Sequence, residues 1–594
     1  MRQLVLLTLL LISGCASPAY KTASGAAVAE VKPGSGDAQL NRLAEEFTNG
    51  YLDWRPQAGT GLGLHQYDGK ITDWSKSSVE GEVARLKSFQ ERFAAINPKS
   101  LSPGPKLDWQ LLGVTIRGEL FKFSTEIEGS PKNPMTYAGA LDVNIYIKRD
   151  FAPLEHRIRS VIAIEQKAPR LFAAARANLG AILPKPYVET AIDIAKGSAD
   201  FLKKDLVEAL KDVTDKSLLM EFQNANQMAI AELRGFANWL EKERLPKAHQ
   251  HYALGREKYQ EMLAAEGITM PPEKILELGL EELKREQKAF ADAAAKIDPK
   301  RKPVEVFKAI QKEHPTEQTL ISETRKNLDA IRQYVVDKHL VTIPSAVRVK
   351  VEETPQYARA TSFASMDTPG PFETKATEAY YYVTPVESDW DKKQKEEWLT
   401  AFNYYTTDVV SIHEAYPGHY VQFLCLNASK ATKAQKVFNS YAFVEGWAHY
   451  TEKMMLDEGF GSSTNADSEV KAAKYRLAQS DEALLRLCRL CVSIQTHCEG
   501  MTLTNATKFF RDNCYYEPKP ASSEALRGTF DPGYLYYTVG KLEILKLRED
   551  YKRQEGANYS LVKFHDELLR HGAPPILFLR EIMLKDPASW DQIL

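Results

Sequence analysis

The stretch Val409-Val410-Ser411-Ile412-His413-Glu414-Ala415-Tyr416-Pro417-Gly418-His419-Tyr420 combines two histidines with a glutamate that directly follows the first histidine. A second stretch, Val444-Glu445-Gly446-Trp447-Ala448-His449-Tyr450, adds another glutamate within a helical pattern. Two imidazoles, one carboxylate ligand and a further glutamate acting as general base are the components of a catalytic zinc site. The two stretches therefore predict a metallohydrolase whose site is built where two helices meet.

The spacing of the two histidines requires an irregular helix. In the common His-Glu-x-x-His arrangement both imidazoles share one helical face, but here the i+4 position is Pro417 and the second histidine, His419, stands at i+6. At about 100° per residue, i+6 lies roughly 240° around a regular helix. Pro417 and Gly418 permit a distortion, so we expect a bulge that turns His419 back toward His413. Otherwise the helix simply ends at Pro417 and the histidines are unrelated.

The third ligand is expected from the second stretch. Glu445, His449 and Glu452 stand at i, i+4 and i+7, on one face of the predicted helix. A face with two carboxylates and an imidazole is costly to bury without a cation. We expect Glu445 to complete the metal site, with Glu452 as the alternative third ligand. His449 is expected to orient a ligand or to contact the substrate.

The expected cofactor is one Zn²⁺ ion, bound by His413, His419 and Glu445, although another divalent metal would suit the same ligands. Glu414 is the expected general base. It would take the proton of the attacking water and later give a proton to the leaving amine.

A tyrosine-rich segment near the carboxyl end supplies further candidates. A tyrosine hydroxyl near a metal can stabilise the negative charge that develops on a carbonyl oxygen, and we expect Tyr537 to do so. Tyr536, about 100° away on a helix, is a candidate for substrate binding. Arg527 or Lys541 would hold a substrate carboxylate, although basic side chains on helices are more often solvated. His497 is a catalytic candidate, although a lone histidine is more often a satisfied core group.

Helical patterns dominate the rest of the chain and predict a mostly α protein, a large helical bundle with a central cleft and a small β-sheet near the metal site. We expect helices at residues 40–52, 78–94, 154–178, 187–213, 216–242, 251–266, 272–297, 319–338 and 394–421. Residues 346–352 and 379–384 are predicted strands. An exposed edge strand beside the metal would pair with an extended peptide, with Tyr382 contacting the substrate; the alternative is a small hairpin that packs on the helices.

The amino terminus predicts an envelope protein. Residues 1–14 have a short charged start and an apolar run too brief to span a membrane, which is typical of a signal peptide. Ile12-Ser13-Gly14-Cys15 resembles a bacterial lipobox with Cys15 as the lipidated residue. Residues 15–37 are then a flexible tether, and residues 38–594 a single helical domain. The resemblance implies the outer membrane, on its periplasmic face.

Composition and net charge limit the classes of binding partner that the sequence indicates. The chain has 594 residues, 44% of them hydrophobic, and a net charge of −2, so neither a nucleic-acid site nor a membrane-binding surface is indicated beyond the anchor at Cys15. Five further cysteines indicate buried thiols or a single disulfide. Cys488 and Cys491 have metal-like spacing, but no second such pair accompanies them, and we assign no metal there. The oligomeric state is not indicated.

The motifs together carry a family resemblance. His413 to His419 and Glu445 to Tyr450 resemble the bacterial family catalogued as domain of unknown function 885, which is similar to the thimet-oligopeptidase and angiotensin-converting-enzyme group of helical zinc peptidases. The resemblance extends to Trp54-Arg55-Pro56, Gly61-Leu62-Gly63-Leu64-His65, Tyr67-Asp68-Gly69, Tyr252-Ala253-Leu254-Gly255, Leu278-Gly279 and Gly533 to Leu545. Tyr420 stands where many members carry a second adjacent histidine, which leaves His419 as the second ligand.

The resemblance implies that Tyr537 acts on the oxyanion, as a tyrosine does in that peptidase group, and that His497 occupies a family position on a neighbouring helix. The expected function is therefore a zinc peptidase that cleaves oligopeptides in the cell envelope. The competing class is a non-catalytic lipoprotein that binds peptides or envelope partners, in which the metal is structural or absent. A closed four-ligand shell would favour that alternative.

Overall fold

The structure is a computed structural model that describes residues 32–355, 359, 363–462 and 467–594. The predicted signal peptide, the predicted lipidation site Cys15 and residues 15–31 of the predicted tether lie outside the described residues. The first described helix begins at Asp37, where the tether was predicted to end.

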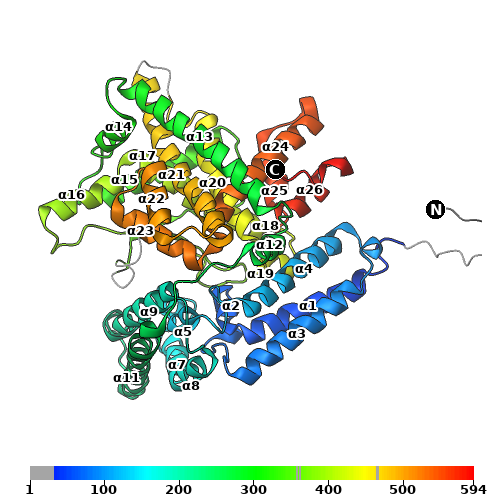
Figure 1. Cartoon of the computed structure of the whole chain (residues 1–594), viewed down its shortest axis with the longest axis vertical. Coiled ribbons are helices and arrows are strands. Elements are labelled where there is room, and N and C mark those ends of the chain that lie inside the picture. Colours follow the sequence, from blue (N-terminus) through cyan, green and yellow to red (C-terminus); the bar gives the residue numbers. More distant parts are fainter. Residues whose placement is uncertain (1–31, 356–358, 360–362, 463–466) are drawn as a thin grey trace, which may run out of the picture.

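The chain is mostly helical, as predicted, and its two parts are stacked (Figure 1). The N-terminal part, drawn from blue to green, lies below. Its helices are α1 (Asp37–Trp54), α2 (Pro56–Gly61), α3 (Lys76–Ala94), α4 (Pro103–Ser124), α5 (Pro134–Ala138), α6 (Ile145–Lys148), α7 (Leu154–Glu165), α8 (Ala168–Asn178), α9 (Lys185–Lys203), α10 (Asp205–Ala209) and α11 (Lys216–Trp239).

The remaining helices form the upper part of Figure 1, and the long α21 packs most extensively against α13. They are α12 (Arg256–Ala265), α13 (Pro272–Ile297), α14 (Pro303–Ile310), α15 (Leu320–Asp337), α16 (Lys392–Ala401), α17 (Tyr404–Glu414), α18 (His419–Ala428), α19 (Lys433–Val437), α20 (Tyr441–Asp457), α21 (Asp467–Cys498), α22 (Leu503–Asn513), α23 (Pro518–Phe530), α24 (Tyr536–Glu555), α25 (Leu561–Leu569) and α26 (Ile576–Met583). Within the described residues, none of these helices is both long and apolar enough to cross a membrane.

Helix length was predicted less well than helix position. The prediction of residues 272–297 is confirmed by α13, but the predicted helix 154–178 is two helices, with a proline in the first turn of α8. Residues 394–421, predicted as one helix, form α16, α17 and α18. Two long helices, α4 and α21, were not predicted. α4 begins at Pro103-Gly104-Pro105, and proline is favoured in a first helical turn.

A small sheet lies beside the helices, as predicted. It has three strands, β1 (Lys350–Glu353), β2 (Ala364–Asp367) and β3 (Tyr380–Val383), in the order β1-β3-β2. β1 runs parallel to β3, which excludes the simple hairpin, and β2 runs antiparallel. The prediction that the strand containing Tyr382 is an exposed edge is wrong, because β3 is the central strand and has a hydrogen-bonded neighbour on each side. Only β1 and β2 have open edges, and β2 was not predicted.

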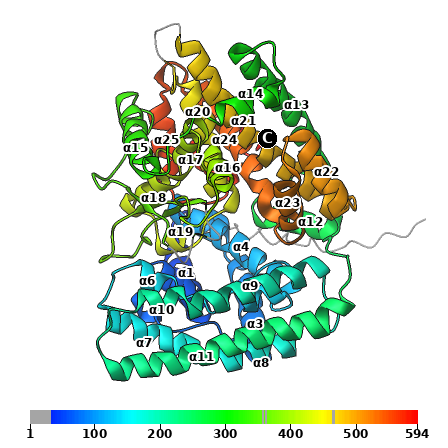
Figure 2. The ribbon, with the colours of Figure 1, turned by 90° about the vertical axis from the view of Figure 1, so that its left-hand side faces the viewer.

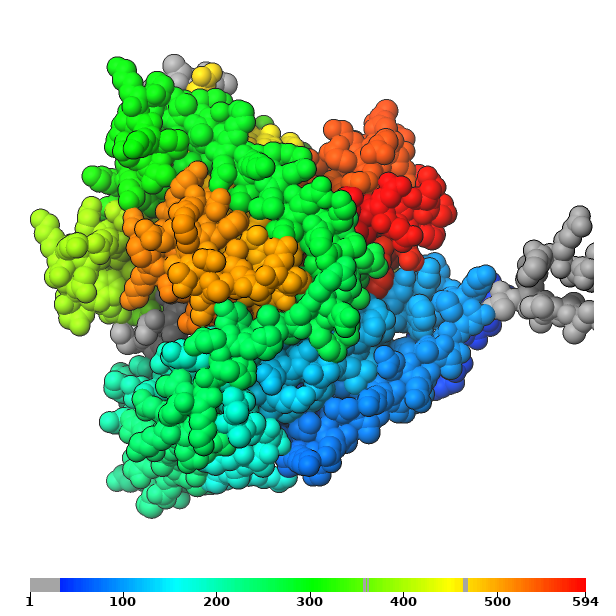
Figure 3. All heavy atoms as spheres, viewed as in Figure 1, coloured from blue at the N-terminus to red at the C-terminus, as the bar shows by residue number. Residues whose placement is uncertain are grey.

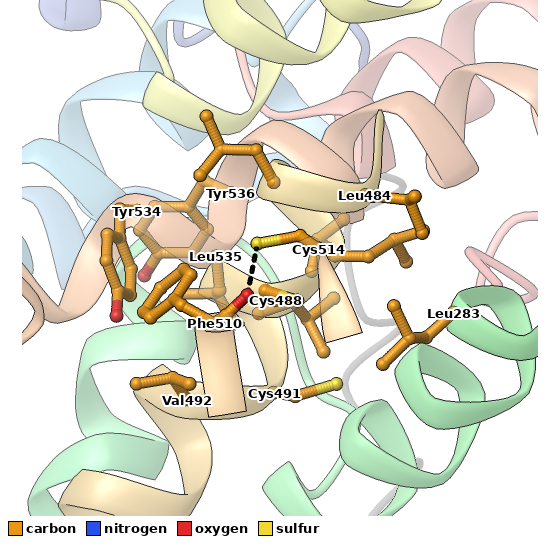
Figure 4. Close-up of a cluster of buried hydrophobic side chains, with 14 of the residues drawn as sticks. Leu283, Leu484, Cys488, Cys491, Val492, Phe510, Cys514, Tyr534, Leu535 and Tyr536 are labelled. Carbon is orange, nitrogen blue, oxygen red and sulfur yellow. Dashed lines mark hydrogen bonds between the residues drawn. The ribbon is translucent and has the colours of Figure 1, made fainter. Parts of the chain in front are cut away.

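The upper part has a core in which thiols pack as apolar groups (Figure 4). Cys488 and Cys491 of α21 lie with Leu283 of α13 and Phe510 of α22 in this cluster. The Cys514 thiol donates to the Phe510 carbonyl oxygen at 3.0 Å. The five described cysteines are all free thiols, which fits the buried-thiol interpretation rather than the single disulfide.

Two glycines allow α20 and α24 to cross in close contact. A Cβ on Gly540 would lie 1.8 Å from the Ala442 carbonyl oxygen, and one on Gly446 would lie 2.5 Å from the Gly540 carbonyl carbon. Both positions therefore require glycine. The crossing brings the first turn of α24 next to the first turns of α20.

The N-terminal part is joined to the upper part through α4 and α19, which lie at their boundary in Figures 1 and 2. Asp108 of α4 accepts hydrogen bonds from Thr432 (2.9 Å) and from Gln435 of α19 (2.6 Å). Lys106 of α4 forms a 2.8 Å ion pair with Glu581 of α26. In Figure 3 the blue surface of the first helices adjoins the green surface of the segment that contains α12.

Candidate metal centre

The junction between α17 and α18 brings the two histidines of the motif together. His413 lies in the last turn of α17 and His419 is the first residue of α18. The expected bulge within one helix is wrong, because the chain leaves the helix at Ala415 and starts a new one. A Cβ on Gly418 would lie 1.8 Å from the His413 carbonyl oxygen, so the turn needs glycine there. Trp447 of α20 donates its indole N–H to the Pro417 carbonyl oxygen at 3.0 Å and so holds the turn from outside.

Glu445 of α20 faces both imidazoles. Its Oε2 atom lies 3.5 Å from His413 Nε2 and 3.5 Å from His419 Nε2, and the two rings are perpendicular with centroids 4.8 Å apart. The possible ligand atoms of the three residues all lie within 4.8 Å of one another. The structure thus brings together the three residues that were predicted as metal ligands.

Two of the three separations between these atoms fit a tetrahedrally coordinated cation. Ligands at 2.0–2.2 Å from a tetrahedral ion are separated from one another by about 3.3–3.6 Å, and both distances from Glu445 fall in this range. Glu445 Oε2 is also buried without a hydrogen-bond partner within the described residues. A buried acceptor without a donor is unfavourable unless a cation satisfies it. Three protein ligands would leave a fourth position open, as in catalytic rather than structural zinc sites.

Glu452 lies behind His413 and is not one of the clustered ligands. Its Oε1 atom is 2.7 Å from His413 Nδ1, the ring nitrogen that faces away from Glu445. Its Oε2 atom is 3.1 Å from His449 Nδ1, and Arg486 Nη2 approaches Oε1 at 3.5 Å. Although burial opposes its charge, Arg486 and the histidines hold the pKa of Glu452 well below the usual range. This carboxylate therefore fixes the orientation of the His413 ring, as carboxylates behind metal-bound histidines commonly do.

His449 continues the same chain of contacts. Its Nε2 atom lies 3.3 Å from Lys541 Nζ, and both side chains are buried. Burial and the adjacent Lys541 lower the pKa of His449 to about 3, so the ring is neutral. A neutral ring with its proton on Nδ1 donates to Glu452 and accepts from Lys541. Lys541, predicted to hold a substrate carboxylate, instead supports His449 inside the protein.

Glu414 is placed differently from the other acidic residues of the site. It follows His413 at the end of α17 and is half-buried. Within the described part of the chain its carboxylate has no hydrogen bond and no ion pair.

Tyr381 of β3, which sequence reasoning missed, accepts a hydrogen bond from Ser411 of α17 at 3.4 Å. Strand alternation places Tyr382 on the other face, stacked on Tyr380 with ring centroids 5.4 Å apart and away from the metal ligands.

Tyr537 reaches the site from the first turn of α24. Its ring stacks on that of His413, with centroids 6.5 Å apart, and its hydroxyl has no hydrogen bond to a described residue. Tyr536 points into the core, is 3% exposed and donates to the Met262 carbonyl oxygen at 3.1 Å. The structure therefore separates the two tyrosines as the helical periodicity predicts, and it brings Tyr537, not Tyr536, to the cluster.

Two arginines that sequence reasoning missed lie against Tyr537. The guanidinium groups of Arg486 and Arg489 lie 5.7 Å and 5.4 Å from the centre of its ring, and both come from α21. Each is also paired with glutamate, Arg486 with Glu482 and Arg489 with Glu524 at 2.8 Å. Their spacing of three residues within an apolar stretch was the available signal, because buried cations at i and i+3 need a buried anionic partner.

The remaining two candidates lie outside the cluster. Arg527 donates to Asp531 at 2.8 Å and approaches the Tyr441 hydroxyl at 3.5 Å, with its side chain 33% exposed. His497 is buried, with Nε2 2.8 Å from the Gly528 carbonyl oxygen and Nδ1 3.3 Å from the Leu254 amide nitrogen. Burial lowers its pKa to about 4, which fits a neutral ring that joins main-chain segments.

Residues 56–583 match the model of a family described as bacterial protein of unknown function, DUF885. The chain belongs to this family. The match contains His413, His419 and Glu445 and most of the N-terminal part, so it covers both stacked parts of the fold. Among curated proteins, none matches the sequence.

Solved structures share this fold. A protein from Shewanella oneidensis, titled a "putative lipoprotein of unknown function", is 24% identical, with a TM-score of 0.74 over 92% of this chain and 100% of its own. A "putative lipoprotein" from Colwellia psychrerythraea is 18% identical, with a TM-score of 0.75 over 94% of this chain and 100% of its own. This chain therefore shares its fold with both proteins along the full length of each of them.

Proposed function

We propose that this protein is a zinc-dependent hydrolase that cleaves oligopeptides in the bacterial cell envelope. The observation that carries the proposal is the position of Glu445 Oε2, 3.5 Å from each of two imidazole nitrogens and without a hydrogen-bond donor. Zinc is the metal that suits two imidazoles and one carboxylate with an open position, and other divalent metals remain outcomes of the test.

Each residue of the site has a proposed part in peptide hydrolysis. When bound, zinc supplies a Lewis acid for the carbonyl group of the substrate. The unpaired Glu414 takes the proton of the attacking water and passes it to the leaving amine. The free Tyr537 hydroxyl donates to the oxygen of the carbonyl as negative charge develops there. Glu452 and His449 hold the ring of His413, and so act as positioning residues.

The envelope location is part of the proposal. Its supports are the lipobox resemblance of Ile12-Ser13-Gly14-Cys15 and the description of both structural relatives as lipoproteins. Anchoring through a lipid on Cys15 at the periplasmic face of the outer membrane would place the helical body beside peptides of the envelope.

The test combines metal analysis with digestion of a peptide library by the full mature chain. We expect the wild-type protein to bind one zinc per chain and to cleave peptides. Glu414→Gln should keep its zinc and its melting temperature but lose hydrolysis, because the change removes the proton acceptor and leaves the ligands intact. Glu445→Gln should lose zinc as well. Glu397→Gln, the same change at an exposed position of α16, is the matched control and should behave as wild type.

Three results would contradict the proposal. Wild-type protein that binds no divalent metal would refute the zinc site. Hydrolysis by Glu414→Gln at the wild-type rate would remove Glu414 as the base. A protein that binds zinc and peptides but cleaves no member of the library would support the non-catalytic lipoprotein instead.

A further inference from the structure

A cavity of about 440 Å³ lies where the N-terminal helices meet α20. Its walls come from α1, α4, α12, the segment that precedes α20, and the start of α24. Ligand sites commonly enclose roughly 300–1,000 Å³. None of the three clustered metal ligands lines this cavity, so it is a separate space from the metal cluster.

Acidic groups outnumber basic groups on the cavity wall. The charged lining residues are Glu119, Glu128, Glu266, Asp531 and Lys122. Two of the carboxylates are neutralised: Glu119 pairs with Arg55 and with Lys122 at 3.1 Å, and Asp531 pairs with Arg527 at 2.8 Å.

The other two carboxylates have no cation. Glu266 accepts hydrogen bonds from the Ser440 hydroxyl at 2.6 Å and from the Tyr441 backbone N–H at 3.5 Å. Neither Glu266 nor Glu128 has an ion pair within the described residues. Glu128 is exposed, so it lies where the cavity meets solvent. Burial raises the pKa of Glu266, although its hydrogen bonds from Ser440 and from the start of α20 oppose the rise. The cavity would therefore favour a positively charged guest.

Tyr441 is the lining residue of the cavity that lies on the same helix as Glu445. It lines the cavity, and it stands four residues before Glu445 on α20, so the two side chains share one helical face. Four residues of helix rise about 6 Å, the length of roughly two residues of an extended peptide. The Tyr441 ring is also 5.8 Å from the ring of Tyr537. A peptide bound across the cluster would thus place a neighbouring residue at the cavity.

We infer that this acid-lined cavity binds a positively charged amino group of the substrate, within one or two residues of the bond that is cleaved. The inference rests on the proposed function for the position of that bond. Two sources share this chemistry, a lysine side chain and the free amino terminus of a peptide. Glu128 and Glu266 supply the attraction, and Tyr441 lies on the side of the cavity that faces Tyr537 and Glu445.

The test measures binding and cleavage separately, with zinc-loaded full-length mature protein. The probes are alanine hexapeptides in which one lysine is placed at each position in turn, with matched peptides that carry norleucine or acetyl-lysine there. Each peptide is made with a free and with an acetylated amino terminus. We expect a cationic peptide to bind about fivefold more tightly than its neutral match, as expected for a partly exposed ion pair, and the advantage to shrink with salt.

Two matched variants test whether the tighter binding of cationic peptides depends on the cavity. Glu128→Gln should abolish most of the advantage of the cationic peptides and leave the binding of neutral peptides unchanged. Its control is Glu126→Gln, which removes the same charge from an exposed residue of the same loop that does not line the cavity. If lysine placement matters, the side chain is the source of the positive charge; if only terminal acetylation matters, the amino terminus is the source.

Equal binding of cationic and neutral peptides to the wild type would overturn the inference, as would an equal loss for both classes in Glu128→Gln. Failure of the proposed hydrolysis gives a different result. In that case no peptide is cleaved, while the preference in binding still reports on the cavity.

Discussion

At the scale of single residues, the two glutamates of α20 show where sequence reasoning stops. Helical periodicity places Glu445 and Glu452 on one face of α20. It does not tell which glutamate joins the candidate metal cluster and which lies behind His413. What separates them is the ring of His413, which presents Nε2 to Glu445 and Nδ1 to Glu452. Glu452, which holds the Nδ1 side of that ring, is itself approached by Arg486 of α21, and Arg486 lies outside both stretches of the motif.

Tyr537 gives a prediction at the same scale. Tyr537→Phe should lower kcat of peptide hydrolysis by a factor on the order of 10²–10³ with little change in KM, because it removes a donor that acts only on the developing oxyanion. Steady-state kinetics on one cleaved peptide measure both constants.

Tyr536→Phe is the control for this prediction. It removes a hydroxyl that bonds the Met262 carbonyl in the core, so it should cost about 1 kcal/mol of stability and leave kcat nearly unchanged. A larger loss of kcat in Tyr536→Phe than in Tyr537→Phe would show that the roles of the two tyrosines are reversed.

At the scale of elements, sequence reasoning located the irregularity at Pro417 and Gly418 but described its form wrongly. A proline and a glycine reveal that a helix is disturbed, and they do not distinguish a bulge from an end. The contacts that decide between them are tertiary, above all the hydrogen bond from Trp447 of α20 to the Pro417 carbonyl oxygen. The histidines were therefore predictable as a pair, and the two separate helices were not.

The crossing of α20 and α24 gives a prediction at this scale. Gly540→Ala should lower the melting temperature, because its Cβ would overlap the Ala442 carbonyl oxygen and overpacking typically costs about 1–3 kcal/mol. It should also lower kcat, since Tyr537 is one turn away on the same helix. Calorimetry and kinetics together measure the two effects.

The control is Gly81→Ala in the exposed face of α3, where an added Cβ meets no atom within 4 Å. This change should stabilise the protein by about 0.5–1 kcal/mol, as alanine does in an open helical position. If Gly540→Ala has the stability and the kcat of the wild type, the packing of α20 against α24 does not require glycine at this position.

At the scale of the whole molecule, the helical class and the small sheet were predictable from local pattern, and the stacking of the two parts was not. The N-terminal part has its own hydrophobic core, which includes α7, α9 and α11. Inside it Glu165 is fully buried, with Oε1 accepting from Asn226 at 3.0 Å and Oε2 without a partner within the described residues. Burial raises the pKa of Glu165 to about 8.

Glu165 makes stability depend on pH. The raised pKa means that, between about pH 4.5 and pH 8, the unfolded chain has lost this proton while the folded chain keeps it. The free energy of unfolding therefore falls as the pH rises through this window. Glu165→Gln, which imitates the protonated acid, should have the melting temperature of the wild type near pH 4.5 and a higher one at pH 8.

Thermal melts at the two pH values measure this difference. Glu208→Gln, the same change on the exposed face of α10, should shift the melting temperature by equal small amounts at both. A gain for Glu165→Gln that does not grow between pH 4.5 and pH 8 would show that Glu165 is already ionised in the folded protein.

The walls of the acid-lined cavity come from both stacked parts of the chain. The three residues of the candidate metal cluster lie between residues 413 and 445. One wall of the cavity, however, is α4, and Arg55, which directly follows α1, forms an ion pair with Glu119 of that wall. A fragment that begins after α11 would contain the three clustered residues but would lack the cavity walls formed by α1, α4 and the loop after α4. If the proposed function holds, the residues of the reaction come from one short part of the sequence, whereas the proposed recognition of the substrate needs both stacked parts of the chain.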